Sequence, residues 1–163
     1  MPSQSGVPLR APAAPGALPD AAAALIAEGR VARLATADAE GQPLVVPICY
    51  AWDGAALFSA IDAKPKAKPA ESLKRIRNIK ENDKVCVVVD RYDEDWRALR
   101  YAIVQGRARL LTGGPDFTRG ADLLLAKYPQ YREMRLGRDS GLMIKVEVEK
   151  VTHWAFSGEG ERD

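Results

Sequence analysis

Residues 43–60, PLVVPICYAWDGAALFSA, contain two apolar runs joined by an Asp-Gly pair. The runs 43–52 and 55–60 are rich in β-branched and aromatic residues, which favour strands. Asp53-Gly54 between them is a strong signal for a tight hairpin turn. The stretch therefore predicts a β-hairpin. Pro47 cannot donate to a ladder, so it marks an edge, a bulge or a place where a ligand interrupts the strand.

Further strand-like segments flank this hairpin on both sides. They are VARLAT (31–36), KVCVVVDRY (84–92), LRYAIVQGRARLLT (99–112) and GLMIKVEVEKVTHWAF (141–156). Gly106 lies within the strand-like run 99–112 and is a candidate bulge or barrel bend. Short helices are expected from Asp20, over residues 71–82, and after Pro115. The chain is thus predicted to be mainly β with small helices, as a six-stranded antiparallel barrel.

Length and composition fit a single globular domain. The chain has 163 residues, of which 47% are hydrophobic and 28% charged. We expect a disordered Pro/Ala-rich tail at 1–19, one domain at 20–158 and a short tail at 159–163. No apolar run reaches the roughly 20 residues that span a bilayer, and no secretory signal is recognisable, so a cytoplasmic location without membrane association is expected.

The sequence offers little material for metal or nucleophilic chemistry. The two cysteines, Cys49 and Cys86, lie in apolar runs and are expected to be buried and reduced. His153 is the single histidine, and no CxxC pair is present. We therefore predict no metal site and name no catalytic side chain.

The segment 64–84, KPKAKPAESLKRIRNIKENDK, concentrates positive charge. It holds eight Lys or Arg and three acidic residues, a local net charge of +5, whereas the whole chain carries +2. Such a cluster after an apolar strand predicts a site for a discrete anion, with phosphate as the first candidate. The alternative is a solvated helix face.

An ordered set of motifs resembles a known family. The motifs are RLAT (33–36), GQPLVVP (41–47), DAKPK (62–66), LKRIRNI (73–79), DRYDEDW (90–96), GRARLL (106–111), KYPQYR (127–132) and HW (153–154). Together they resemble the flavin-binding split-barrel superfamily, the pyridoxamine 5'-phosphate oxidase-like proteins. Within it the chain most resembles the deazaflavin-dependent (coenzyme F420-dependent) oxidoreductases. The resemblance implies a six-stranded antiparallel split β-barrel with flanking helices.

The resemblance also implies a cofactor site. The matching positions for the cofactor phosphate are Ser59, Lys64, Lys66, Lys74 and Arg75. These hydroxyl and cationic groups can make charge-assisted hydrogen bonds to phosphate oxygens. The strand expected to face the ring contains Val46, Pro47 and Ile48. Ser59 could equally be an ordinary strand residue, and Pro47 an edge-strand proline.

The implied function is hydride transfer between coenzyme F420 and a small organic substrate, with FMN as the alternative cofactor. Arg100 and Tyr101 depart from the family pattern, so the substrate class is not inherited. The C-terminal residues lack the substrate-binding set of vitamin B6 oxidases, which excludes that activity. A homodimer is expected, because such barrels usually pair across their sheet.

Two readings from other classes stay open. The first is a non-catalytic cofactor carrier or haem-binding split barrel, since one fold hosts several functions. The second is a nucleic-acid-binding barrel that uses the segment 64–84. That segment lacks interleaved aromatic residues and the net charge is small, so no nucleic-acid partner is expected.

Overall fold

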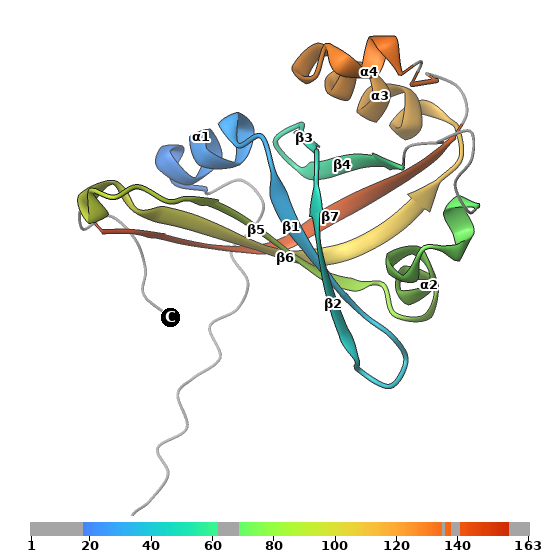
Figure 1. The fold of residues 1–163 in the computed structure, drawn as a ribbon, viewed down its shortest axis with the longest axis horizontal. Helices are drawn as coiled ribbons and strands as arrows, with labels where there is room; N and C mark the ends of the chain where they lie inside the picture. The colour runs from blue at the N-terminus through green and yellow to red at the C-terminus, as the bar shows by residue number, and fades with distance from the viewer. Residues whose placement is uncertain (1–17, 62–68, 135, 138–140, 157–163) are drawn as a thin grey trace, which may run out of the picture.

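Seven antiparallel strands form one curled sheet in the order β2-β1-β5-β6-β7-β4-β3, as the computed structural model shows (Figure 1). The structure describes residues 18–61, 69–134, 136–137 and 141–156. The strands are β1 (Ala32–Ala37), β2 (Pro43–Ile48), β3 (Ala51–Trp52), β4 (Ala56–Ile61), β5 (Lys84–Arg91), β6 (Arg100–Leu111) and β7 (Leu142–Ala155). The helices are α1 (Asp20–Glu28), α2 (Lys74–Glu81), α3 (Pro115–Lys127) and α4 (Gln130–Glu133), with short 3-10 turns η1 (Ala70–Ser72) and η2 (Trp96–Ala98). The predicted fold class is confirmed.

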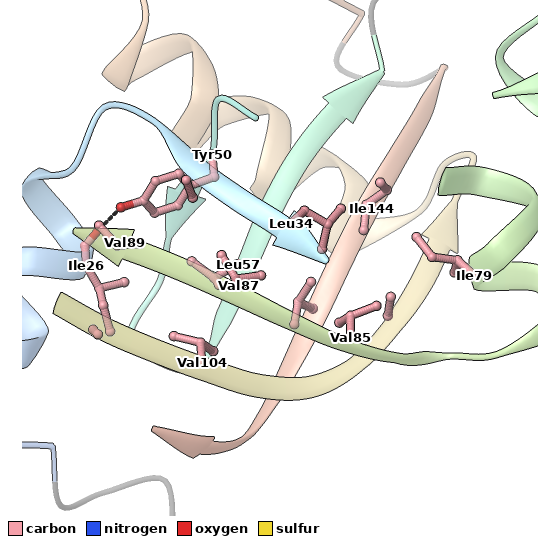
Figure 2. Packing of buried hydrophobic residues seen from close by; sticks show 14 of the residues in the cluster. Ile26, Leu34, Tyr50, Leu57, Ile79, Val85, Val87, Val89, Val104 and Ile144 are labelled. Atoms are coloured by element: carbon pink, nitrogen blue, oxygen red, sulfur yellow. Dashed lines mark hydrogen bonds between the residues drawn. The ribbon is translucent and has the colours of Figure 1, made fainter. Parts of the chain in front are cut away.

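The predicted strand count was one too low, because residues 43–52 do not form one strand. The chain leaves the sheet at Cys49 and Tyr50, so β2 pairs with β1 at one edge and β3 pairs with β4 at the other. Tyr50 is fully buried at this crossing, and its hydroxyl donates to the carbonyl of Ile26 (Figure 2). Its backbone N–H donates to the hydroxyl of Tyr128. These buried bonds satisfy polar groups that the sheet ladder no longer serves.

The main core fills the inner face of the curled sheet. Strand residues such as Leu34, Val87 and Val104 are fully buried there, and Ile26 of α1 covers them from one side (Figure 2). Period-two alternation explains this directly, because alternate residues of β1 and β5 are buried while their neighbours are not. A second cluster packs α3 against β4 through Phe58.

The predicted bulge at Gly106 is confirmed. The register of β6 against β7 shifts between Gln105 and Gly106. A Cβ atom at Gly106 would lie 2.0 Å from the carbonyl oxygen of Glu147, so only glycine permits this approach of the two backbones. The bulge thereby lets the long strands β6 and β7 stay paired while they twist.

The end of α3 is fastened to the turn after α1. The ammonium of Lys127 donates to the carbonyl oxygen of Gly29 at 2.6 Å and lies 4.1 Å from the ring centroid of Tyr50. Burial and the nearby charge of Arg30 lower the pKa of Lys127 to about 8. One lysine therefore ties α3, the α1–β1 turn and the Tyr50 crossing together.

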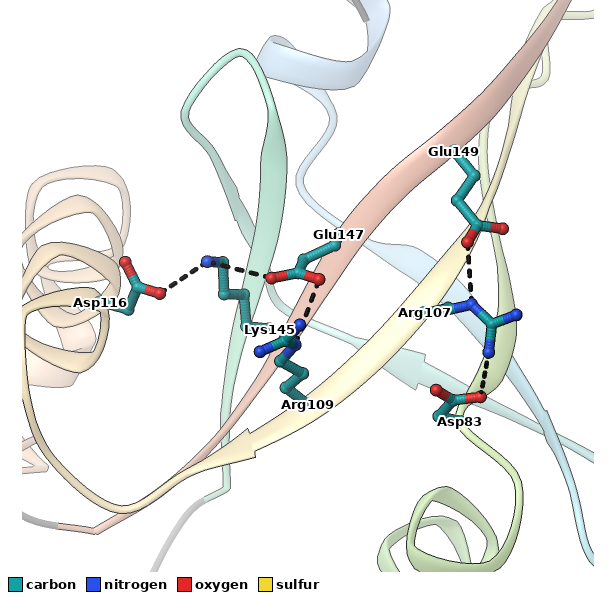
Figure 3. Close-up of polar contacts among 7 residues, drawn as sticks. All are labelled: Asp83, Arg107, Arg109, Asp116, Lys145, Glu147 and Glu149. Carbon is teal, nitrogen blue, oxygen red and sulfur yellow. Dashed lines mark hydrogen bonds and ion pairs between the residues drawn. The ribbon is translucent and has the colours of Figure 1, made fainter. Parts of the chain in front are cut away.

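A ladder of alternating charges runs across β6 and β7 (Figure 3). Its members are Asp83, Arg107, Glu149, Arg109, Glu147, Lys145 and Asp116. Arg107 bridges two acids at 2.8 and 2.9 Å, and Lys145 reaches Asp116 of α3 at 2.6 Å. Because each cation of the ladder contacts an acid, these strands present a balanced surface rather than a basic stripe.

The two cysteines differ in exposure. Cys86 is half-buried, and burial raises the pKa of its thiol. The expectation that Cys49 is buried was wrong: its thiol is exposed, because residue 49 lies at the crossing outside the sheet. Within the described residues, every helix is too short or too polar to cross a lipid bilayer.

Replacing Gly106 with Ala should lower the free energy of unfolding by about 3 kcal/mol, the upper end of overpacking effects. The added methyl group would meet a backbone carbonyl, which cannot rotate away as a side chain can. Urea denaturation measures this effect. Gln105→Ala, at the exposed neighbouring position, is the matched control and should change stability little. Equal stabilities of the two variants would contradict the assignment of the close approach.

Candidate cofactor site

The strand expected to face the cofactor ring lies at the edge of the described sheet. β2 pairs only with β1 there, so its other side presents backbone donors and acceptors without a strand partner. Val46 and Ile48 are half-buried and pack against the main core, whereas Pro47 is exposed on the opposite face. The predicted set therefore divides between two faces of β2. The edge position accounts for a proline inside a strand.

The start of α2 holds two of the predicted phosphate ligands, Lys74 and Arg75. Leu73 is the N-cap residue and carries no polar atom, so the first N–H groups of α2 lack a cap from that side chain. Lys74 is exposed and Arg75 is half-buried. Leu73 packs against the main core cluster, and α2 lies against β1.

Lys74 is held in place by an acid that the sequence analysis did not single out. Its Nζ donates to Oδ2 of Asp38 at 2.9 Å. The other carboxylate oxygen of Asp38 accepts from the backbone N–H of Gln42 at 2.8 Å and of Glu40 at 3.2 Å. The hydrogen bond from Lys74, followed by that from Gln42, holds the pKa of Asp38 below its usual range. Sequence showed Asp38 only as part of a turn, and its partner lies 36 residues away.

A lysine ammonium has three N–H donors. The bond to Asp38 uses one of them, so Lys74 retains donors for a second anion. Asn78 on the same helix donates to the hydroxyl of Thr36 at 3.0 Å, which fixes α2 against β1. The cations of α2 thus stand on a helix anchored to the sheet at two points.

Ser59 lies elsewhere. It is 5% exposed on β4, and its hydroxyl donates to the carbonyl oxygen of Cys49 at 2.8 Å. This bond supports the crossing between β2 and β3, so the structure gives Ser59 a structural role at the end of β2. Lys64 and Lys66 lie within 62–68, outside the described residues. Residues 1–17 of the predicted tail 1–19 and all of the predicted tail 159–163 also lie outside them.

The outer face of the sheet carries apolar side chains that the core does not use. The register places one row of partners on this face: Pro47, Arg33, Val88, Ile103 and Thr152. The next row contains Val45, Ala35 and Cys86, of which Val45 is 59% exposed. Tyr101 and Trp154 stack on the same face with ring centroids 5.6 Å apart. We call these residues the outer apolar face.

Trp154 and Trp96 differ in exposure. Trp154 is half-buried on the outer apolar face. Trp96 is 62% exposed on η2. In the part of the chain that the structure describes, no group of three or more His, Cys, Asp or Glu side chains is arranged to hold a metal ion.

The pair Lys74–Asp38 predicts a pH dependence of stability. The folded-state pKa of Asp38 is lowered, so its contribution is present above the unfolded value of about 3.9 and is lost as the pH falls through the folded value. Asp38→Asn should therefore melt at a lower temperature than the wild type at pH 7. The difference should shrink when thermal unfolding is followed down to pH 2.5.

The control for this experiment is Glu40→Gln, an exposed acid in the same turn. It removes the same formal charge without the bond to Lys74. A constant difference between wild type and Asp38→Asn over the whole pH range would contradict the ion pair.

Comparisons with known proteins agree with this geometry. The family model described as pyridoxamine 5'-phosphate oxidase matches residues 18–155. A search of curated protein sequences finds no match. A FAD-binding protein from Mesorhizobium loti is similar in structure, with a TM-score of 0.62, 24% identity, and coverage of 80% of this chain and 87% of its own.

Two other solved structures share the fold at lower identity. A conserved Mycobacterium tuberculosis protein has a TM-score of 0.67 and 16% identity, covering 94% of this chain and 96% of its own. HutZ, the heme storage protein of Vibrio cholerae, has a TM-score of 0.60 and 14% identity, covering 78% of this chain and 87% of its own. At these identities the likeness concerns the fold alone.

Proposed function

Because the chain belongs to the pyridoxamine 5'-phosphate oxidase family, we propose that it is an oxidoreductase that binds a phosphorylated flavin-type cofactor. The cofactor proposed first is coenzyme F420, with FMN as the alternative, and the substrate is a small organic molecule. The observation that carries the proposal is the pair Lys74 and Arg75 at the start of α2, a helix that lies against β1 and is tied by Lys74 to Asp38 in the turn before β2. The family match spans these elements.

The donor set fits a phosphate group. Lys74 keeps ammonium donors beyond its bond to Asp38, and a guanidinium such as that of Arg75 can bind phosphate oxygens bidentately. The first turn of α2 has no capping side chain at Leu73, so its N–H groups and dipole favour an anion. Asp38 keeps the Lys74 ammonium in one position before an anion arrives, which reduces the entropy lost on binding.

The cofactor, when bound, supplies the hydride chemistry itself. The chain would contribute position and shielding. Lys74 and Arg75 would hold the phosphate, while the edge of β2 would offer backbone groups and Val46 and Ile48 an apolar boundary that excludes water. No acid–base side chain is assigned to the reaction.

The preference for coenzyme F420 rests on charge. Its extended anionic tail uses more cations than the single phosphate of FMN, and the segment 64–84 carries a net charge of +5. On β6 and β7 the cations of the ladder are each paired with an acid, so these strands do not extend the positive charge of the segment. This pairing also argues against a nucleic-acid partner, which would need a longer basic track.

Haem binding is the second candidate function, because HutZ shares the fold. The one imidazole of this chain, His153, is 6% exposed on the inner side of the sheet. A haem at this imidazole would have to fit its whole macrocycle against the inner face, which demands far more room than a single small anion does. We therefore rank haem below the flavin-type cofactors.

Changing Lys74 and Arg75 together to Ala should weaken cofactor binding by about 100-fold or more, since charged hydrogen bonds contribute about 1.5–3 kcal/mol each. Fluorescence titration with oxidised and reduced F420 and with FMN measures the dissociation constants and ranks the cofactors. Haemin, followed by its absorbance, is titrated in parallel.

The matched control is the double change Arg77→Ala and Lys80→Ala. Both residues are exposed, and replacing them removes as much positive charge from α2 as replacing Lys74 and Arg75 does. Its affinity should stay near that of the wild type. Equal losses of affinity in the two double variants would show that only the total charge of the helix matters. Unchanged affinity in the variant that lacks Lys74 and Arg75 would contradict their assignment as phosphate ligands.

We further propose a homodimer that pairs through the outer apolar face. Its half-buried Val88, Ile103 and Trp154 and its exposed Val45 form a continuous surface by register, as a subunit interface requires. Val45→Glu should convert the dimer to a monomer in light scattering. Met134→Glu, at an exposed apolar position that follows α4, should leave the dimer intact. A monomeric wild-type protein with cofactor bound would contradict the proposal.

A further inference from the structure

The strand register places three donor residues near one another where β5 ends, β6 begins and β7 ends. Arg91 of β5 is the register partner of Arg100 on β6, and Arg100 is in turn the partner of Ala155 on β7. His153 on β7 is the partner of Ala102, two residues along from Arg100. We call Arg91, Arg100 and His153 the arginine–histidine corner.

The three side chains lie on the same face of the sheet. Ala102 is fully buried on the inner face, so its partner His153 also faces inward. Arg100 stands two residues from Ala102 on the same strand and shares that face. Diagonal neighbours of this kind are close enough for long side chains to interact.

Polar atoms at this corner are buried without partners. His153 is 6% exposed, and neither of its ring nitrogens has a hydrogen-bond partner. The Nε of Arg100 is likewise buried and without a partner. In native proteins nearly all buried polar groups form hydrogen bonds, because a buried donor without an acceptor has lost its bonds to water and gained none in return. Adjacent unpartnered atoms on neighbouring strands therefore indicate a missing acceptor.

The charges at the corner specify what kind of acceptor is missing. Arg91 and Arg100 are directly opposite each other, an arrangement of like charges that is unfavourable in a sheet. Arg91 has Asp93 at 3.9 Å, a long contact. Burial, and then the charge of Arg100, lower the pKa of His153, so its imidazole is neutral near pH 7 and offers one N–H donor. Water could accept these bonds but would leave the positive charge unbalanced.

We propose that the arginine–histidine corner binds a small oxyanion, a carboxylate or phosphate group, through the Nε–H of Arg100 and a ring N–H of His153. Arg91 adds charge at the rim. This site lies on β5, β6 and β7, apart from the α2 and β2 residues of the proposed cofactor site, and does not depend on that proposal.

The single histidine makes the test direct. Selective ¹⁵N-histidine labelling of the full chain gives imidazole signals from His153 alone. Inorganic phosphate and acetate are titrated separately at constant ionic strength, because screening would otherwise mimic binding. A saturable shift of the His153 signals with at least one of these anions is expected.

Variants then assign the donors. Arg100→Gln should weaken the anion about tenfold or more, and Arg100→Lys, which keeps the charge but loses the Nε donor, should weaken it less. Arg97→Gln is the matched control. Arg97 is an exposed arginine at the same end of the sheet, bonded to Asp95, and its removal should leave the affinity unchanged. Thermal unfolding of each variant confirms that it is folded.

The proposal is overturned if the wild-type protein shows no saturable shift with either anion, or if Arg100→Gln and Arg97→Gln bind equally.

Discussion

The passage of the chain from one sheet edge to the other at Cys49 and Tyr50 is the constraint on which the rest of the fold depends. Buried bonds from Tyr50 to Ile26 and Tyr128, and from Ser59 to Cys49, hold that passage. Without it, β2 and β3 would continue as one strand and the sheet could not curl around its core. The same passage leaves β2 at an edge, where its backbone is available to a ligand.

The proposed phosphate site shows how such a fold can prepare a cation for a ligand. Asp38 fixes the Lys74 ammonium and in turn is fixed by two backbone N–H groups of its own turn. The carboxylate also reduces the net charge that an incoming anion meets. The Lys74 ammonium therefore attracts an anion less strongly but is held in one position. A fixed donor favours a phosphate of matching geometry over other anions in solution.

The sequence predicted the fold class, the antiparallel pairing and the bulge at Gly106, because each follows from local periodicity or from the special geometry of glycine. It missed the break within residues 43–52, since an uninterrupted apolar run looks the same whether it joins one edge or two. The bonds that enforce the break link Tyr50 to residues 24 and 78 positions away. For the site, the family resemblance pointed to Lys74 and Arg75, which lie where α2 begins, and their binding role stays a prediction. Residue types could not show that Ser59 is already bonded to Cys49, or that Asp38 is the partner of Lys74.

Lys127, which binds the end of α3 to the turn after α1, also makes the stability of the fold depend on pH. Its folded pKa of about 8 lies below the value of about 10.4 expected for an unfolded lysine. Between these values the unfolded chain binds more protons than the folded one, so this group makes folding more favourable as the pH rises from about 8 to about 10.4. The lysine that joins three elements of the fold thus opposes alkaline unfolding over that interval, although its hydrogen bond and aromatic contact are formed by the charged state.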